Sequence, residues 1–101
     1  MATAARPLPV NANGVPQYPK GHSGRLLAVM AAIDLLERPT AYTIAGLTGL
    51  SKGNIDRYVS ALNAELGTQV QKDATGQYLI ESWGQILNPE GVKSALTIGM
   101  Y

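Results

Sequence analysis

The side chains that could carry out covalent or metal chemistry are few in this 101-residue chain. Cysteine is absent and His22 is the single histidine, so the sequence offers neither a thiolate site nor a histidine zinc cluster. No spacing that indicates an acid–base pair occurs among the carboxylates, which include Glu37, Glu65, Glu81 and Glu90. No serine stands in a nucleophile elbow, and no phosphate-binding glycine loop occurs. We therefore expect no enzyme, no cofactor and no small-molecule ligand.

Hydrogen-bonding side chains do gather, at helical spacing, between residues 52 and 66. Four apolar residues in this stretch mark one buried helix face: Ile55, Val59, Leu62 and Leu66. At 3.6 residues per turn, the opposite face carries small and polar residues: Gly53, Arg57, Ser60 and Ala64. A major groove about 12 Å wide admits such a slim helix, where Arg57 can hold a guanine edge and the nearby Asn54 an adenine edge. This pattern favours recognition of duplex DNA.

Other polar residues are placed to contact phosphates rather than bases. Ser51 and Thr43 lie at expected helix starts, where hydroxyl and amide groups can donate to phosphate oxygens. Lys52 is a further phosphate candidate, and so is Lys72, the one cation of the expected hairpin. Asp56 follows Lys52 by four residues, so we expect these two side chains to form an ion pair that partly occupies the lysine.

The N-terminal segment is rich in residues that prevent regular structure. Residues 1–21 contain four prolines: Pro7, Pro9, Pro16 and Pro19. We expect a flexible arm there, although its cations Arg6 and Lys20 leave open a contact with a minor groove. The first helix is expected to begin after Ser23 and to end before Pro39. Its apolar face would be formed at three- and four-residue spacing by Leu26, Leu27, Met30, Ile33 and Leu36.

Two further helices must hold the polar face described above. Thr40 or Thr43 can cap a short second helix, and Gly49 after it can adopt the left-handed conformation of a tight turn. Ser51 then caps a third helix that runs from residue 52 to about residue 66 and ends at Gly67.

The apolar period changes from helical to alternating after residue 67. Residues 68–72 and 77–83 are expected to form two strands, joined by a turn from Asp73 to Gly76. Asn88 before Pro89 predicts a short last helix. The order of these helices and strands along the chain predicts an α+β, mostly α fold. We expect a winged helix-turn-helix domain over residues 22–87, with a three-helix core and a β-hairpin wing. Residues 88–101 would add a short C-terminal helix or a dimer contact.

Residues 24–87 resemble the DNA-binding domain of the IclR-type transcriptional regulators, and more loosely those of the MarR and ArsR types. The segments that carry the resemblance are residues 25–29, 42–52 and 73–79. The resemblance implies a winged fold, DNA binding through the third helix and a dimer. IclR-type proteins carry an effector domain after the wing, which this sequence lacks, so we expect no ligand sensing. Gln77 stands where the family often has a wing arginine.

We expect sequence-specific binding of double-stranded DNA by a transcriptional regulator that places the helix over residues 52–66 in the major groove. The alternative is a winged helix used for protein–protein assembly without DNA, which the net charge of only +1 and the pI near 8.0 favour. No apolar run approaches the roughly 20 residues of a membrane span, and the N-terminus does not resemble a secretion signal. These features predict a cytoplasmic protein.

A homodimer is the expected state, because two-fold pairing doubles the bases and phosphates that one small module can contact. The first helix would supply Leu27, Ala31 and Leu35 to the interface. The end of the chain would supply Trp83, Ile86, Leu87, Val92, Leu96, Ile98 and Met100. The alternative is that these C-terminal residues fold back over the core of their own subunit.

Overall fold

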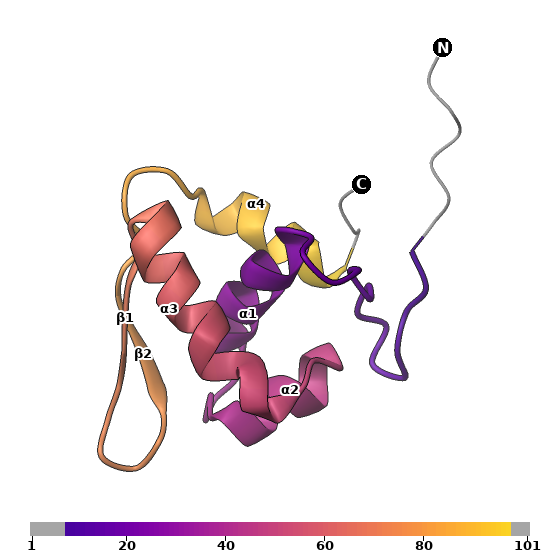
Figure 1. Cartoon of the computed structure of the whole chain (residues 1–101), viewed down its shortest axis with the longest axis horizontal. Coiled ribbons are helices and arrows are strands. Elements are labelled where there is room, and N and C mark those ends of the chain that lie inside the picture. Colours follow the sequence, from indigo (N-terminus) through magenta and orange to yellow (C-terminus); the bar gives the residue numbers. More distant parts are fainter. Residues whose placement is uncertain (1–7, 98–101) are drawn as a thin grey trace.

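The computed structural model describes residues 8–97 of the chain. Within them lie four α-helices, two short 3-10 helices and one two-stranded antiparallel sheet. The class is α+β and mostly helical, as the sequence predicts (Figure 1). No helix in this part of the chain is long and apolar enough to cross a bilayer. Arg6, Ile98 and Met100, each given a possible role above, lie outside the described residues.

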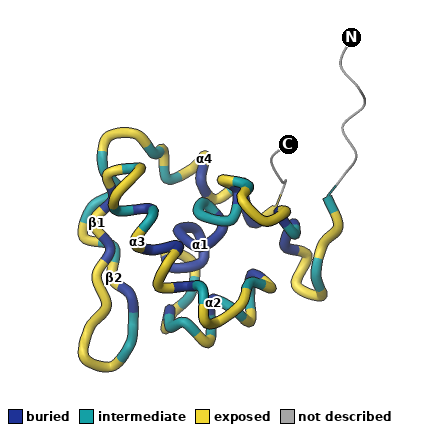
Figure 2. Tube along the Cα trace, viewed as in Figure 1, coloured by how far each residue is buried: buried dark blue, intermediate teal, exposed yellow. Residues whose placement is uncertain are grey.

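Helix α1 (Gly24–Leu35) is the centre of the structure. Helices α2, α3 and α4 and strand β2 all contact it, and Figure 2 shows it as the most continuously buried element. The sequence predicts one apolar face on this helix, but every residue from 28 to 33 is buried. A helix surrounded on all sides has no need of a polar face. Ala31, expected at a dimer interface, is fully buried within its own subunit.

The start of α1 is where the sequence predicts it, but a different side chain caps it. The Gly24 backbone N–H donates to Nδ1 of His22 at 2.8 Å, whereas the side chain of Ser23 makes no capping hydrogen bond. The backbone of Ser23 is already helical, with φ −62° and ψ −21°. A capping serine requires an extended backbone, from which its hydroxyl can reach the amides ahead.

Helix α2 (Ala41–Thr48) begins at the predicted cap. Thr40 Oγ1 accepts from the N–H of Thr43 at 3.1 Å, and Thr43 Oγ1 accepts from the N–H of Thr40 at 2.8 Å, which forms a capping box. Gly49 then has φ +81°, the left-handed turn that the sequence predicts. Helix α3 (Ile55–Leu66) follows, and it starts three residues later than expected because Lys52–Asn54 form the 3-10 helix η1. Ser51 makes no side-chain cap.

Strands β1 (Gln69–Lys72) and β2 (Tyr78–Ser82) pair antiparallel and form the predicted hairpin. Asp73 Oδ1 accepts from the backbone N–H groups of Thr75 and Gln77, which fixes the turn between the strands. The hairpin is tied to the helices next to its turn, where the N–H of Tyr78 donates to the carbonyl of Pro39 at 2.8 Å. That bond holds β2 against the residues that lead into α2.

The N-terminal segment differs most from expectation. We expected residues 1–21 to form a flexible arm, but residues 8–22, which we call the strap, pack onto the helices. Val15 and Tyr18 are 3% and 4% exposed and belong to the core. The Tyr18 hydroxyl donates to the carbonyl of Ala95 at 2.7 Å, so the strap contacts the C-terminal end of the described chain (Figure 1). Prolines disfavour regular structure, yet an irregular segment can pack firmly if its own side chains join the core.

Helix α4 (Pro89–Lys93) and the 3-10 helix η2 (Ser94–Leu96) close the structure over α1. Asn88 Oδ1 accepts from the N–H groups of Glu90 and Gly91, as the Asn-Pro-Glu sequence predicts. Val92, Ala95 and Leu96 are buried. Val92 and Leu96 were expected at a dimer interface. They cover their own subunit instead, because α1 offers an apolar surface on the side that α2 and α3 leave open.

Candidate nucleic-acid interface

The outer face of α3, continued by η1 at its start, carries most of the residues that the sequence singled out. Gly53, Arg57 and Ser60 are exposed, Lys52 is exposed beside them, and Asn54 is half-buried. The opposite face is buried, and its residues include the predicted Ile55, Val59 and Leu62. The 3-10 helix η1 replaces the expected first α-helical turn, but the polar residues still lie on the outer side of the helix.

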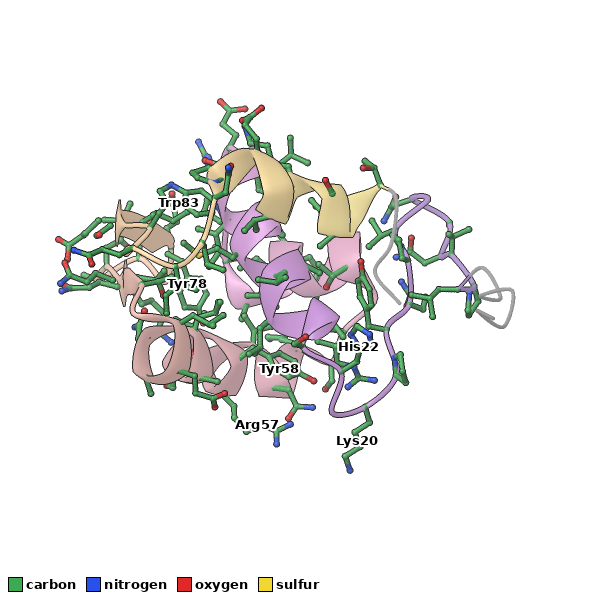
Figure 3. All side chains as sticks on the ribbon, turned by 90° about the horizontal axis from the view of Figure 1, so that it is seen from above. Lys20, His22, Arg57, Tyr58, Tyr78 and Trp83 are labelled. Carbon is green, nitrogen blue, oxygen red and sulfur yellow. The ribbon has the colours of Figure 1, made fainter. Side chains whose placement is uncertain are left out.

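Arg57 is the residue of this face best suited to bind a ligand. Its guanidinium carbon lies 5.5 Å from the centre of the Tyr58 ring, a cation–π contact that restrains the side chain. Among the described residues, no carboxylate lies within ion-pair distance of Arg57 or of Lys52. In Figure 3 the Arg57 side chain points away from the body of the molecule. Both cations are therefore available to an external anion or base edge.

Asp56 has different partners from the one expected. It pairs with Lys72 of the hairpin at 3.0 Å and accepts a hydrogen bond from the Tyr78 hydroxyl, whereas Lys52 is not its partner. Lys52 belongs to η1 rather than to α3, so the two residues are not one α-helical turn apart. The hairpin register sets Lys72 opposite Tyr78, and both then face Asp56. Lys72, expected to contact phosphate, is thus occupied within the chain.

This three-residue contact links α3 to the hairpin and shifts two pKa values. The hydrogen bond from Tyr78 and the neighbouring ammonium of Lys72 lower the pKa of Asp56. Burial and the Asp56 carboxylate raise the pKa of Tyr78. At neutral pH the carboxylate is charged and the phenol is protonated, which is the pairing that this hydrogen bond requires.

Two residues expected to contact phosphate, Thr43 and Ser51, differ in whether their hydroxyl groups are already hydrogen-bonded within the chain. The Thr43 hydroxyl donates to the carbonyl of Arg38 at 2.7 Å while it accepts from the N–H of Thr40, so the helix cap uses its proton. Ser51 is exposed beside Gly53 at the start of η1, and its side chain caps nothing. Of these two hydroxyls, only that of Ser51 is free to donate outward.

The strap contributes a feature that the sequence analysis missed: it holds the turn between α2 and α3. Side-chain amides of Asn11, Asn13 and Gln17 donate at 2.9 to 3.0 Å to carbonyls at the end of α2. Their acceptors are Gly46, Leu47 and Thr48. The last carbonyls of a helix have no partner within it, so these amides replace water there. The sequence gives one sign of this role: three amide side chains fall within seven residues of a proline-rich segment.

Arg25 joins the strap and α1 to α3. Its Nε donates to the carbonyl of Tyr18 at 2.9 Å, and its Nη1 donates to the hydroxyl of Tyr58 at 2.9 Å. Tyr58 is only 9% exposed, and its hydroxyl oxygen accepts this bond from Arg25. Lys20 and His22 lie close to these residues (Figure 3). A second group of basic side chains therefore lies beside Arg57.

Comparison with protein-family models, with curated proteins and with solved structures finds no significant match for this chain. The function must therefore be inferred from the side chains and their arrangement.

Proposed function

We propose that the chain is a winged helix-turn-helix domain that binds duplex DNA in a sequence-specific manner, as a transcriptional regulator. In this proposal α3 enters the major groove and the β1–β2 hairpin is the wing. The observation that carries the proposal is the outer face of α3, where Arg57 is exposed and has no carboxylate partner among the described residues. The resemblance of residues 24–87 to IclR-type DNA-binding domains points in the same direction.

The arrangement of the elements supports the fold assignment. Helix α2, a left-handed glycine at position 49 and helix α3 follow one another as in a helix-turn-helix. The hairpin comes next, and the bond from Tyr78 to Pro39 attaches its second strand to the segment before α2. These elements leave the outer face of α3 uncovered and hold it between the turn and the hairpin.

The chemistry of α3 supports DNA as the partner. A guanidinium without a counterion can hold the O6 and N7 atoms of guanine with two hydrogen bonds, and Asn54 can hold adenine in the same way. Gly53 is exposed and has no side chain, so a duplex can approach the backbone closely there. Lys52 and Ser51 stand at the start of this face, where they can bind phosphates on either side of the groove.

The alternative is a protein–protein assembly module, and the hairpin is the observation that favours it. The pairing of Lys72 with Asp56 leaves the hairpin without a free cation, and Leu79 on β2 is 51% exposed. An apolar strand without a charge to bind phosphate suits a protein partner better than DNA. The net charge of +1, which by itself favours assembly, does not exclude DNA binding, because a nearly neutral protein can still concentrate its cations on one face.

A homodimer remains part of the proposal, on a smaller surface than the sequence analysis assigned. Ala31, Val92 and Leu96 are buried within the subunit, whereas Leu35 at the end of α1 is 66% exposed. Leu35 borders a groove of about 330 Å³ between α1 and the C-terminal helices, which a second copy could fill. A two-fold contact there leaves the outer face of α3 uncovered.

The salt dependence of DNA affinity tests the proposal against its alternative. Fluorescence anisotropy with a labelled 20-base-pair duplex of random sequence would be measured between about 50 and 200 mM salt. A DNA-binding protein shows a linear fall of log affinity with log salt concentration, with a slope of about 0.9 for each phosphate that it neutralises. Absence of duplex binding at 50 mM salt and micromolar protein would leave the assembly function as the better explanation.

A further inference from the structure

We propose that the cleft between the strap and α3 is a second anion site, which binds one phosphate of the DNA backbone through Lys20, His22 and Arg25. The inference rests on the proposed function and extends it, because it assigns to the strap and to the start of α1 a contact with the same duplex that α3 reads.

The cleft has a volume of about 460 Å³. Lys20 and His22 of the strap and Arg25 of α1 line one side, and Arg57 and Tyr58 of α3 line the other. Figure 3 shows Lys20 and Arg57 projecting from the same side of the molecule, with His22 and Tyr58 behind them, nearer the body of the molecule. Both projecting cations are exposed, so a large ligand such as a nucleic-acid strand can reach the cleft without a conformational change.

The charge of the cleft is unbalanced. Lys20, Arg25 and Arg57 are cations, Glu65 is the one carboxylate in the lining, and no ion pair joins it to any of them among the described residues. Arg25 is half-buried and uses two of its N–H groups on neutral acceptors, a carbonyl and a phenol oxygen. A guanidinium has five such donors, and their planar arrangement matches the oxygens of a phosphate or a carboxylate. An anion in the cleft would neutralise charge that the protein leaves uncompensated.

Two of the three donors, His22 and Arg25, are held in place before any ligand binds. His22 Nδ1 accepts from the Gly24 N–H, so the proton of the neutral imidazole lies on Nε2, which can donate outward. The imidazole stacks on the ring of Tyr18 with centroids 5.1 Å apart. A side chain at Gly24 would collide with the same Tyr18 ring, so the strap and α1 pack too closely for any residue but glycine. A fixed set of donors loses little entropy on binding.

A backbone phosphate is a better occupant than a free anion, because the cleft and the outer face of α3 share Arg57. A strand that borders the groove occupied by α3 must pass one end or one side of that helix. The strap places Lys20 and His22 on such a side. A contact of this kind positions α3 in the groove without reading sequence.

The test compares Lys20→Gln with Lys93→Gln, which removes the same charge from a residue of α4 that does not line the cleft and is ion-paired with Asp34 and Glu90. Lys93 lines the groove assigned to the dimer contact, so sedimentation must first show that both variants keep the oligomeric state of the wild type. The slope of log affinity for a 20-base-pair duplex against log salt should fall by about 0.9 in Lys20→Gln and stay unchanged in Lys93→Gln. Between 50 and 200 mM salt, the wild type should lose about 3.5-fold more affinity than Lys20→Gln.

Three outcomes overturn the inference, and they differ in what else they imply. Equal slopes for wild type and Lys20→Gln would refute the phosphate contact in the cleft but would leave the proposed DNA binding by α3 standing. If the wild type bound no duplex, both the phosphate contact and the proposed DNA binding would be refuted. If millimolar inorganic phosphate shifts the NMR signals of His22 and Arg25 Nε–H but duplex does not, the cleft binds a free anion and not DNA.

Discussion

Replacement of Gly49 by alanine tests the link between the strap and the turn that precedes α3, and Gly46→Ala is its matched control. Both glycines lie at or near the end of α2, three residues apart. They differ in backbone and in surroundings. Gly49 has φ +81° and the Gln17 side chain against it, whereas Gly46 is helical and a Cβ there would meet nothing within 4 Å.

The expected magnitude at position 49 has two parts. The left-handed backbone disfavours an L-residue by roughly 1–2 kcal/mol. A Cβ would also displace the Gln17 amide, whose Nε2 donates to Val15 O at 2.8 Å and to Thr48 O at 2.9 Å. Two such hydrogen bonds contribute about 1 kcal/mol each, so Gly49→Ala should lower the free energy of unfolding by about 3–4 kcal/mol in total. Gly49→Val should cost more, since a β-branched residue rarely adopts positive φ.

Gly46→Ala should have the opposite sign. Alanine in a helix interior is more favourable than glycine by about 0.8–1.0 kcal/mol, and the site is open. Urea denaturation followed by far-UV circular dichroism gives both values, provided that the dependence on urea has the same slope in each variant. Gly49→Ala should also cost less in a Gln17→Ala background, where about 1–2 kcal/mol of backbone strain remains. Equal effects of the two alanine substitutions would refute the assigned turn, and equal costs with and without Gln17 would refute the contact.

Three other predictions concern pH, capping and assembly. The pKa of Asp56 is lowered from 3.8 in the folded chain, so its contacts stabilise the fold above that pH and lose this effect below it. The stability advantage of wild type over Asp56→Asn should therefore shrink in urea titrations as the pH falls from neutrality through about 4, and a constant difference would contradict it. His22→Ala should destabilise the chain by about 1 kcal/mol and Ser23→Ala by less than about 0.5 kcal/mol in thermal denaturation, since only the first accepts the Gly24 N–H. The reverse order would refute the cap. Sedimentation at micromolar concentration should show a homodimer that Leu35→Glu dissociates, and a monomer that binds a single unpaired half-site would refute it.

Features fixed by neighbours along the chain were predictable from the sequence. The Thr40 cap, the left-handed Gly49 and the turn after Asp73 depend on a few adjacent residues, and each is present. The apolar spacing of α3 likewise fixes which residues face outward, so exposure of Gly53, Arg57 and Ser60 was predictable.

Features that depend on distant packing were not predictable in this way. The strap has no periodic apolar pattern, and its position depends on contacts between residues distant in the sequence, such as the hydrogen bond from Tyr18 to Ala95. Asp56 had a plausible partner four residues away, but a 3-10 turn removed that partner and the hairpin supplied Lys72. Helix α1 shows the same limit, because its amphipathic pattern gives no sign that α4 covers the side expected to be free for a dimer.

The most direct test of DNA reading by α3 is a binding selection from random duplexes, run in parallel with wild type and Arg57→Ala. We expect the wild type to enrich one motif that contains a guanine, because a two-bond contact from Arg57 discriminates against other bases by about 1–3 kcal/mol. The Arg57→Ala variant should keep its fold and lose that preference. An identical motif from both proteins would contradict the role of Arg57, and no enriched motif from the wild type would contradict sequence-specific DNA binding itself.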